Sequence, residues 1–166
     1  MDLRDLPPPH RSRTSPTSLT VRDRFEWTRA AGIGPPPTVF GDLAGRRVVE
    51  LGCGSGHNLA HLAIHHHAEG VGIDHDPLKI QRARTLYAGL PRLAFIRTDA
   101  AAYLRSRPPE SIDLCLSIFG AFSFVERADL RPLLTAAACA LRHGGRLALT
   151  LRATDTTDLV LIYTRS

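Results

Sequence analysis

The residues Val48-Val49-Glu50-Leu51-Gly52-Cys53-Gly54-Ser55-Gly56-His57-Asn58 decide the fold of this chain. A short apolar run ends in an acid, a glycine-rich turn follows, and Leu59, Leu62 and Ala63 then recur at helical spacing. This order predicts a strand, a tight turn and a helix, which form the first unit of an open α/β sheet. Glycines suit the turn because the chain bends sharply and a ligand approaches the backbone closely. The free amides at the helix start favour a polar or anionic ligand group.

The rest of the chain alternates between strand and helix patterns. We expect strands at 46–51, 70–74, 93–97, 112–117 and 146–151. We expect helices at 56–67, 77–88, 100–105 and 128–142, the last closing at Gly144-Gly145. This alternation predicts an α/β fold: a single open, doubly wound domain whose mostly parallel sheet has helices on both faces. After a polar, turn-prone stretch, residues 158–164 are expected to return antiparallel beside strand five. The alternative is a truncated chain with an exposed edge, which would favour dimerisation.

The residues before this sheet divide into two parts. Residues 1–18 contain Pro7-Pro8-Pro9, several arginines and a Ser/Thr cluster, and are expected to form a flexible arm. Residues 19–45 are expected to hold short lid or cap helices: one at 19–31, carrying Phe25 and Trp27, and a second short element around 38–43. The α/β domain itself is expected to span 46–166.

Composition narrows the possible partners. The chain has 166 residues and a net charge of +5, and its basic residues are arginines except for Lys79. Three widely spaced cysteines contain no C-x-x-C pair, which argues against a disulfide framework or a zinc site of that kind. We find neither an apolar run long enough for a membrane span nor the apolar core of a signal peptide. We therefore expect a cytoplasmic protein, monomeric or homodimeric, without nucleic-acid or membrane partners.

The segment Glu50-Leu51-Gly52-Cys53-Gly54-Ser55-Gly56 resembles the first motif of class I S-adenosylmethionine-dependent methyltransferases. Its spacing is G-x-G-x-G, whereas the dinucleotide fingerprint G-x-G-x-x-G would need a glycine at His57. The resemblance covers residues 46–151, because acids also stand at the ends of the next two predicted strands, at Asp74 and Asp99. It implies S-adenosylmethionine as the cofactor, a sheet of strand order 3-2-1-4-5, and methyl transfer as the activity.

The resemblance assigns the adenosine end of the cofactor to the acids after strands two and three. Asp74 would accept hydrogen bonds from both ribose hydroxyls, with His75 facing the adenine. The alternative role for Asp74 is to cap the next helix, which suits Asp76 better. Asp99 would accept from the adenine amino group, and Ala100 would donate its amide to the ring. Capping of a helix by Asp99 is compatible with that role, since a carboxylate has two oxygens.

The methionine end is assigned to the first strand and its turn. Glu50 would lie near the ammonium group, unless it pairs with an arginine. Asn58 would either touch this end or only cap its turn. Trp27, on a lid with Phe25, would help to exclude water, and one of its neighbouring arginines would meet the carboxylate. The expected cofactor-binding residues are Trp27, Glu50, Gly52, Cys53, Gly54, Asn58, Asp74, His75, Asp99, Ala100, Ser117 and Phe119.

Missing motifs favour a small organic acceptor, methylated at an O, N or C atom. Ser117-Ile118-Phe119-Gly120 stands where nucleobase amino-methylating enzymes carry Asn/Asp-Pro-Pro-Tyr/Phe, and Cys115 lies inside a strand as a small hydrophobe. The end of strand four also lacks the Asp and Asn cluster that metal-dependent phenol methylation needs. We expect no metal site, because the histidines at 57, 61 and 65 are spaced by four and are expected to lie on one solvent-exposed face of a helix. The sequence identifies no general base.

Two alternatives remain open at this point. The first is a cofactor-binding or partner-binding remnant of a methyltransferase without catalysis. The second is a nicotinamide-dependent oxidoreductase, against which the glycine spacing and the acid before it argue.

Overall fold

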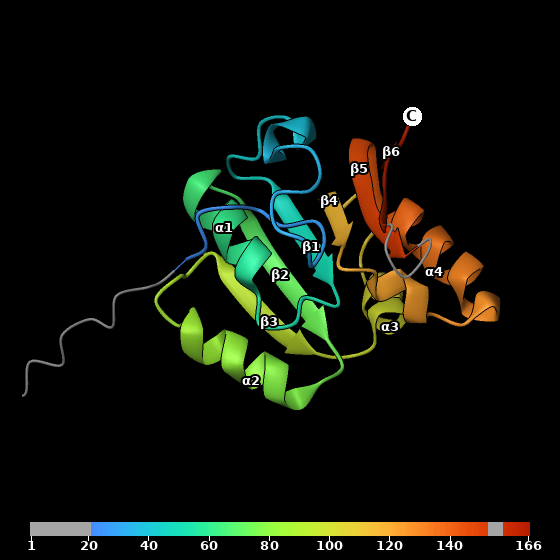
Figure 1. Cartoon of the computed structure of the whole chain (residues 1–166). Coiled ribbons are helices and arrows are strands. Elements are labelled where there is room, and N and C mark those ends of the chain that lie inside the picture. The colour runs from blue at the N-terminus through green and yellow to red at the C-terminus, as the bar shows by residue number, and fades with distance from the viewer. Residues whose placement is uncertain (1–20, 153–157) are drawn as a thin grey trace, which may run out of the picture.

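A mostly parallel sheet forms the centre of the protein (Figure 1). The structure is a computed structural model that describes residues 21–152 and 158–166, and these contain six strands in the order β3-β2-β1-β4-β5-β6. Every neighbouring pair is parallel except β5 and β6, which are antiparallel. The predicted α/β class, the strand order and the antiparallel last strand are confirmed. The predicted arm at 1–18 and the polar stretch at 153–157 lie outside the described residues.

The bounds of most elements lie close to those expected from the sequence. The strands are β1 Arg47–Leu51, β2 Glu69–Asp74, β3 Leu93–Arg97, β4 Ile112–Ser117, β5 Leu141–Arg152 and β6 Asp158–Thr164. The α-helices are α1 His57–His65, α2 Pro77–Leu86, α3 Ala100–Arg105 and α4 Arg127–Ala140. Two 3-10 helices, η1 Pro37–Phe40 and η2 Ala121–Phe124, complete the described elements.

Helix α4 ends earlier than expected, because the glycine pair belongs to strand β5. Leu141 is fully buried and already pairs with Ile112, and the register then shifts so that Arg146 pairs with Leu114. Gly144, with φ +72°, adopts a left-handed backbone conformation inside this irregularity. The prediction that the pair closes the helix was wrong. The two glycines instead allow a β-bulge in β5. In sequence, a glycine pair that marks such a bulge resembles one that marks the end of a helix.

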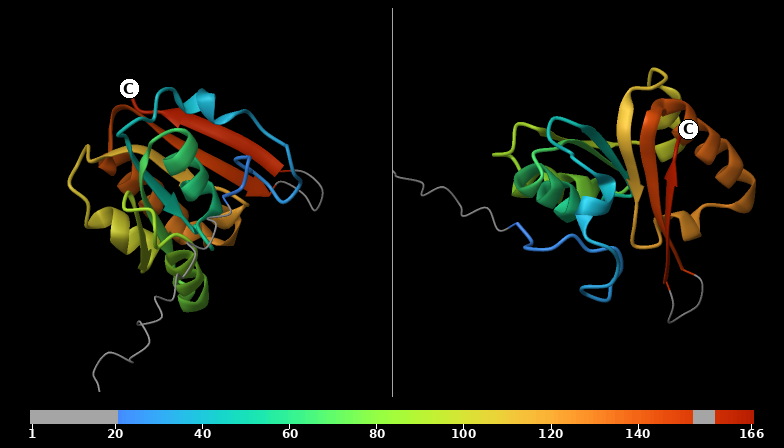
Figure 2. Two further views of the ribbon diagram at one scale, coloured as in Figure 1. Left: turned by 90° about the vertical axis from the view of Figure 1, so that its left-hand side faces the viewer. Right: turned by 90° about the horizontal axis from the view of Figure 1, so that it is seen from above.

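The two faces of the sheet are covered by different helices. Helices α1 and α2 lie on one face and α3 and α4 on the other, as two perpendicular views show (Figure 2). The first face packs Leu59 and Leu62 of α1 against Ile80 of α2, and the second packs Leu104 of α3 with Leu133 of α4. This doubly covered arrangement leaves the carboxyl ends of β1, β2 and β4 as the place where a ligand can reach the backbone.

Residues 21–36 run without a helix beside α1, so the predicted helix at 19–31 is absent from the described residues. Phe25 and Trp27 are both buried, and residues two apart share a side in an extended chain but not in a helix. Their rings pack edge-on at 5.3 Å, and both contact Phe40 of η1. Burial of this aromatic cluster therefore favours an extended segment over the helix that the sequence suggested.

Candidate functional site

The glycine-rich turn after β1 has the sharp backbone that the sequence predicts. Gly52, Gly54 and Gly56 have φ values of +72°, +56° and +75°, in the left-handed region. A Cβ atom on Gly56 would lie 2.4 Å from the ring of Phe95, so no side chain fits there. The amides of Gly52 and Cys53 both donate to the Ile73 carbonyl, at 2.7 and 2.9 Å. The turn is thereby held against the end of β2.

Asp74, at the end of β2, fixes this turn from the other side. Its carboxylate accepts from the Gly54 amide through one oxygen and from the Asp76 amide through the other, each at 2.9 Å. Asp76 caps α2 by accepting from the amides of Leu78 and Lys79, as expected. Asp74 is 4% exposed, and each of its oxygens keeps a lone pair for a further donor. It is therefore oriented to accept hydrogen bonds from a ligand.

Glu50 and Ser117 end the two central strands, β1 and β4, with buried polar groups that lack a partner. Among the described residues, Glu50 Oε2 and Ser117 Oγ are the buried side-chain atoms without a hydrogen bond. Burial raises the pKa of the Glu50 carboxyl to about 8, with a hydrogen bond from the Leu59 backbone acting against it and the charge of Asp74 adding to it. Buried polar atoms without partners are costly, so both atoms indicate a site built for a ligand.

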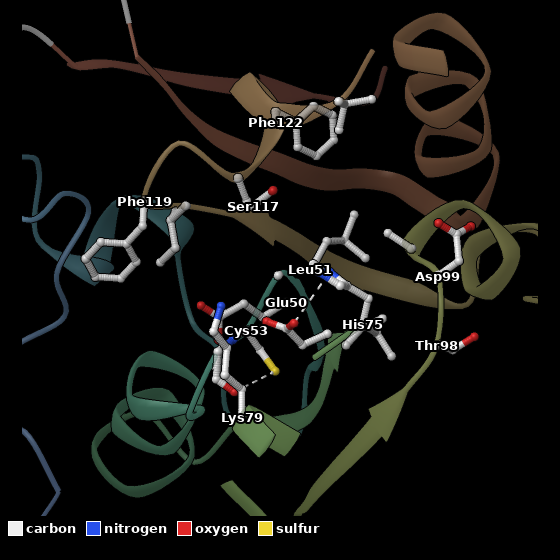
Figure 3. A pocket seen from close by; sticks show the side chains of 18 of the residues that line it. Glu50, Leu51, Cys53, His75, Lys79, Thr98, Asp99, Ser117, Phe119 and Phe122 are labelled. Carbon is white, nitrogen blue, oxygen red and sulfur yellow. Dashed lines mark hydrogen bonds and ion pairs between the residues drawn. The ribbon is translucent and has the colours of Figure 1, made fainter. Parts of the chain in front are cut away.

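A cavity of about 1070 Å³ collects these groups at the carboxyl edge of the sheet. Phe119 lies on one flank, Thr98 and Asp99 lie on the other, and Glu50 lies between them (Figure 3). All of the predicted site residues except Trp27 line this cavity. Asp99 lines it while also capping α3, since its Oδ1 accepts from the Ala102 amide at 2.8 Å. The structure thus brings together residues from the ends of four strands.

Trp27 is the predicted site residue that the structure places elsewhere. Its side chain is 1% exposed, lies in the aromatic core, and donates from Nε1 to the Pro35 carbonyl at 2.7 Å. Its backbone carbonyl, by contrast, accepts from the amide of Phe119 at 3.2 Å and from Thr150 Oγ1 at 3.0 Å. Trp27 therefore supports the cavity wall from behind instead of lining it.

Asn58 has a contact that the sequence did not reveal. Its side chain forms two hydrogen bonds with the backbone of one residue, accepting from the Glu26 amide at 3.0 Å and donating to the Glu26 carbonyl at 2.7 Å. Asn58 is 2% exposed and also lines the cavity, where its second N–H remains available to a ligand. It fastens the segment before the sheet to the start of α1.

Charged residues on the helices also line the cavity and were not singled out from the sequence. They are Lys79 and Arg82 of α2, Arg105 of α3, Glu126 just before α4, and Asp129 in its first turn. For Lys79, Glu126 and Asp129 the available signal was their position at the start of α2 or α4, because these helices follow strands that end at the site. Arg82 and Arg105 lie farther along their helices, where no such signal marks them.

The histidines of α1 do not form the solvated face expected from their spacing. His61 is 6% exposed, and its Nδ1 lies 2.9 Å from the Arg22 carbonyl oxygen. The ring of His61 is 4.5 Å from that of His65, centre to centre. Within residues 21–152 and 158–166, no three His, Cys, Asp or Glu side chains are grouped so as to hold a metal ion. In the same ranges no helix has the length and apolar character that a bilayer crossing requires.

Known proteins share sequence features and the fold with this chain. A family model described as a methyltransferase domain matches residues 48–145, more than half of the chain. A trans-aconitate 2-methyltransferase of Methylobacterium radiotolerans is 41% identical over 70 residues, which are 42% of this chain and 26% of that protein. The chain therefore belongs to this methyltransferase domain family, and its resemblance to the class I S-adenosylmethionine-dependent enzymes is confirmed.

Solved structures agree with this assignment at the level of the fold. Phosphoethanolamine N-methyltransferase 2 of Haemonchus contortus, in complex with S-adenosyl-L-methionine, superposes with a TM-score of 0.61 and 23% identity, over 69% of this chain and 26% of that one. A chain of the Haloferax volcanii complex with the methyltransferase activator Trm112 gives 0.58 and 29%, over 67% of this chain and 47% of that one. This chain thus spans about a quarter to a half of the length of these relatives.

Proposed function

We propose that this chain binds S-adenosylmethionine in the cavity and transfers its methyl group to a small organic acceptor. The observation that carries the proposal is the buried carboxyl of Glu50, whose Oε2 atom has no partner, placed among the acids at the ends of the neighbouring strands. A cationic ammonium group would satisfy this carboxyl. The family assignment favours this cofactor over a nicotinamide. Two of the relatives named above, the trans-aconitate and phosphoethanolamine methyltransferases, are named for small acceptors.

The residues present fit the cofactor along its length. Glu50 and the free N–H of Asn58 would hold the methionine end, Asp74 would accept from the ribose hydroxyls, and Asp99 with Ala100 would border the adenine. The bound cofactor supplies an activated methyl group on a sulfonium, so the chemistry is an in-line displacement. The protein contributes by orienting both reactants and excluding water, effects that reach roughly 7–11 kcal/mol in well-aligned systems.

Asp74 provides the direct test of the cofactor site. The Asp74 carboxylate accepts hydrogen bonds from the backbone amides of Gly54 and Asp76. Asp74→Asn removes the negative charge and places a donor NH₂ group opposite one of these two amides, so that one hydrogen bond is lost. We expect the affinity for both S-adenosylmethionine and S-adenosylhomocysteine to fall roughly 10- to 100-fold, since a hydrogen bond to a charged group contributes about 1.5–3 kcal/mol. Isothermal titration calorimetry measures both values.

Asp76→Asn is the matched control, because Asp76 caps α2 outside the cavity wall and asparagine caps helices equally well. Its cofactor affinity should equal that of the unmodified chain. Equal affinities in the Asp74→Asn and Asp76→Asn variants would exclude Asp74 from the cofactor site. Binding of the cofactor without turnover on any acceptor would instead favour a binding function without catalysis.

A further inference from the structure

A segment before the sheet crosses one end of the cavity and is fastened at several points. We call residues 22–29 the strap. Its Arg22 carbonyl lies against His61 of α1, its Glu26 backbone is paired with Asn58, and its Trp27 carbonyl accepts from the Phe119 amide after β4. The strap therefore runs from α1 to the loop after β4, and its backbone is held at several points between them.

The strap brings two guanidinium groups, those of Arg22 and Arg29, to the cavity wall. Both side chains are exposed, and neither forms an ion pair with another described residue. Arg24, which lies between them on the strap, does not line the cavity. Lys79, Arg82 and Arg105 also line the cavity, from α2 and α3, so Arg22 and Arg29 are the cations that the strap contributes. Each of the two is suited to an anionic ligand group, since a guanidinium matches a carboxylate or phosphate with paired hydrogen bonds.

The two arginines lie at different ends of the site. Burial, followed by the charges of Arg22 and Arg82, lowers the pKa of His57, the first residue of α1, so Arg22 lies near the methionine end that Glu50 and Asn58 would hold. Arg29 follows Trp27 by two residues, and the Trp27 carbonyl accepts from the Phe119 amide, so the backbone at Arg29 lies close to the loop after β4. The single carboxylate of the cofactor would lie at the end that Arg22 and Arg82 share, and would leave Arg29 without a partner.

We infer that Arg29 selects an acceptor with an anionic group, a carboxylate or a phosphate. This inference rests on the proposed function, because it places the acceptor beside the methyl-donor end of the same cavity. Phe119, which lines the same cavity, would cover the apolar part of that acceptor. The wall also has two acids at the start of α4, and these lie on a different element from the strap: Glu126 just before the helix and Asp129 in its first turn. Arg29 is thus a specificity-determining residue.

The test uses the full chain saturated with S-adenosylhomocysteine, so that only the acceptor position is open. Succinate, inorganic phosphate and the neutral diamide of succinate are titrated into this complex by calorimetry. We expect succinate or phosphate to bind and the diamide to bind at least tenfold more weakly, and the two anions to show which oxyanion the site prefers. Arg29→Gln should weaken anion binding about tenfold, whereas Arg24→Gln, on the same strap, should leave it unchanged.

The outcomes separate this inference from the proposed function. Arg29→Gln should retain the affinity for S-adenosylhomocysteine, because Arg29 is assigned to the acceptor. Equal binding of succinate and its diamide, no binding of either anion, or no effect of Arg29→Gln would each overturn the inference and leave the cofactor site standing. Failure of the unmodified chain to bind S-adenosylhomocysteine would overturn the proposed function itself.

Discussion

Trp27→Ala is expected to lower the free energy of unfolding by about 3–5 kcal/mol, the range for a fully buried aromatic residue. The indole is 1% exposed, packs against Phe25 and Phe40, and donates to the Pro35 carbonyl. Gly34 lies against the same ring, where a Cβ atom would come within 2.3 Å of it. A chain packed so closely around the indole cannot readily fill the space that alanine leaves. Urea unfolding, followed by circular dichroism, measures the loss.

Tyr163→Ala is the control for this change, because Tyr163 is an aromatic residue of β6 that is 51% exposed. It should cost at most about 1 kcal/mol. The sequence suggested that the Trp27 side chain forms a lid on the cofactor, and the same variant tests that idea. Unchanged stability together with a collapse of cofactor affinity would show that the indole contacts the cofactor and not the core.

Glu50→Gln is expected to weaken S-adenosylmethionine binding roughly 10- to 100-fold, since it removes a charged partner worth about 1.5–3 kcal/mol from the ammonium group. The same substitution should change how stability depends on pH. The pKa of Glu50 is about 8 in the folded chain, above its ordinary value of 4.5, because the carboxyl is buried. Between these two values the folded chain keeps a proton that the unfolded chain releases.

The folded state of the unmodified chain therefore loses stability as pH rises from about 4.5 to about 8. Glutamine does not titrate, so the variant should gain about 4–5 kcal/mol relative to the unmodified chain over this window. Unfolding in urea at pH 5 and pH 8.5, for both proteins, measures the difference. Glu69→Gln, at the exposed start of β2, is the control and should show no such gain. Parallel pH dependence in the Glu50→Gln variant and the unmodified chain would mean that Glu50 is ionised when free of ligand.

The sequence predicted the strand ends well, because local signals determine them. Gly52, Gly54 and Gly56 mark a turn that needs left-handed backbone conformations, and acids directly after apolar runs mark the carboxyl edge of a parallel sheet. Asp74 and Asp76 could even be assigned different roles from their positions, and Asp76 does cap α2. The cavity wall then follows from the topology, since parallel strands end at one edge.

The segment before the sheet could not be predicted in the same way, because its conformation depends on distant partners. Phe25 and Trp27 are compatible with a helix until Phe40 and the α1 side of the core are known. The bond between Thr150 and the Trp27 carbonyl joins residues 123 positions apart, and no local pattern signals it. Asn58 shows the same limit: its type suits a cap or a ligand contact, and only the fold reveals its pairing with Glu26.

The fastening of the strap also has a consequence for the order of events during synthesis. The ribosome makes residues 22–29 before the sheet, yet their partners come from α1, from the loop after β4 and, last, from β5. The strap must therefore wait while about 120 further residues are added, and contacts this distant along the chain form late in folding. The nascent chain can assemble β1, α1 and β2 long before it can close the cavity, so competence to bind a ligand is acquired only after β5 has been made.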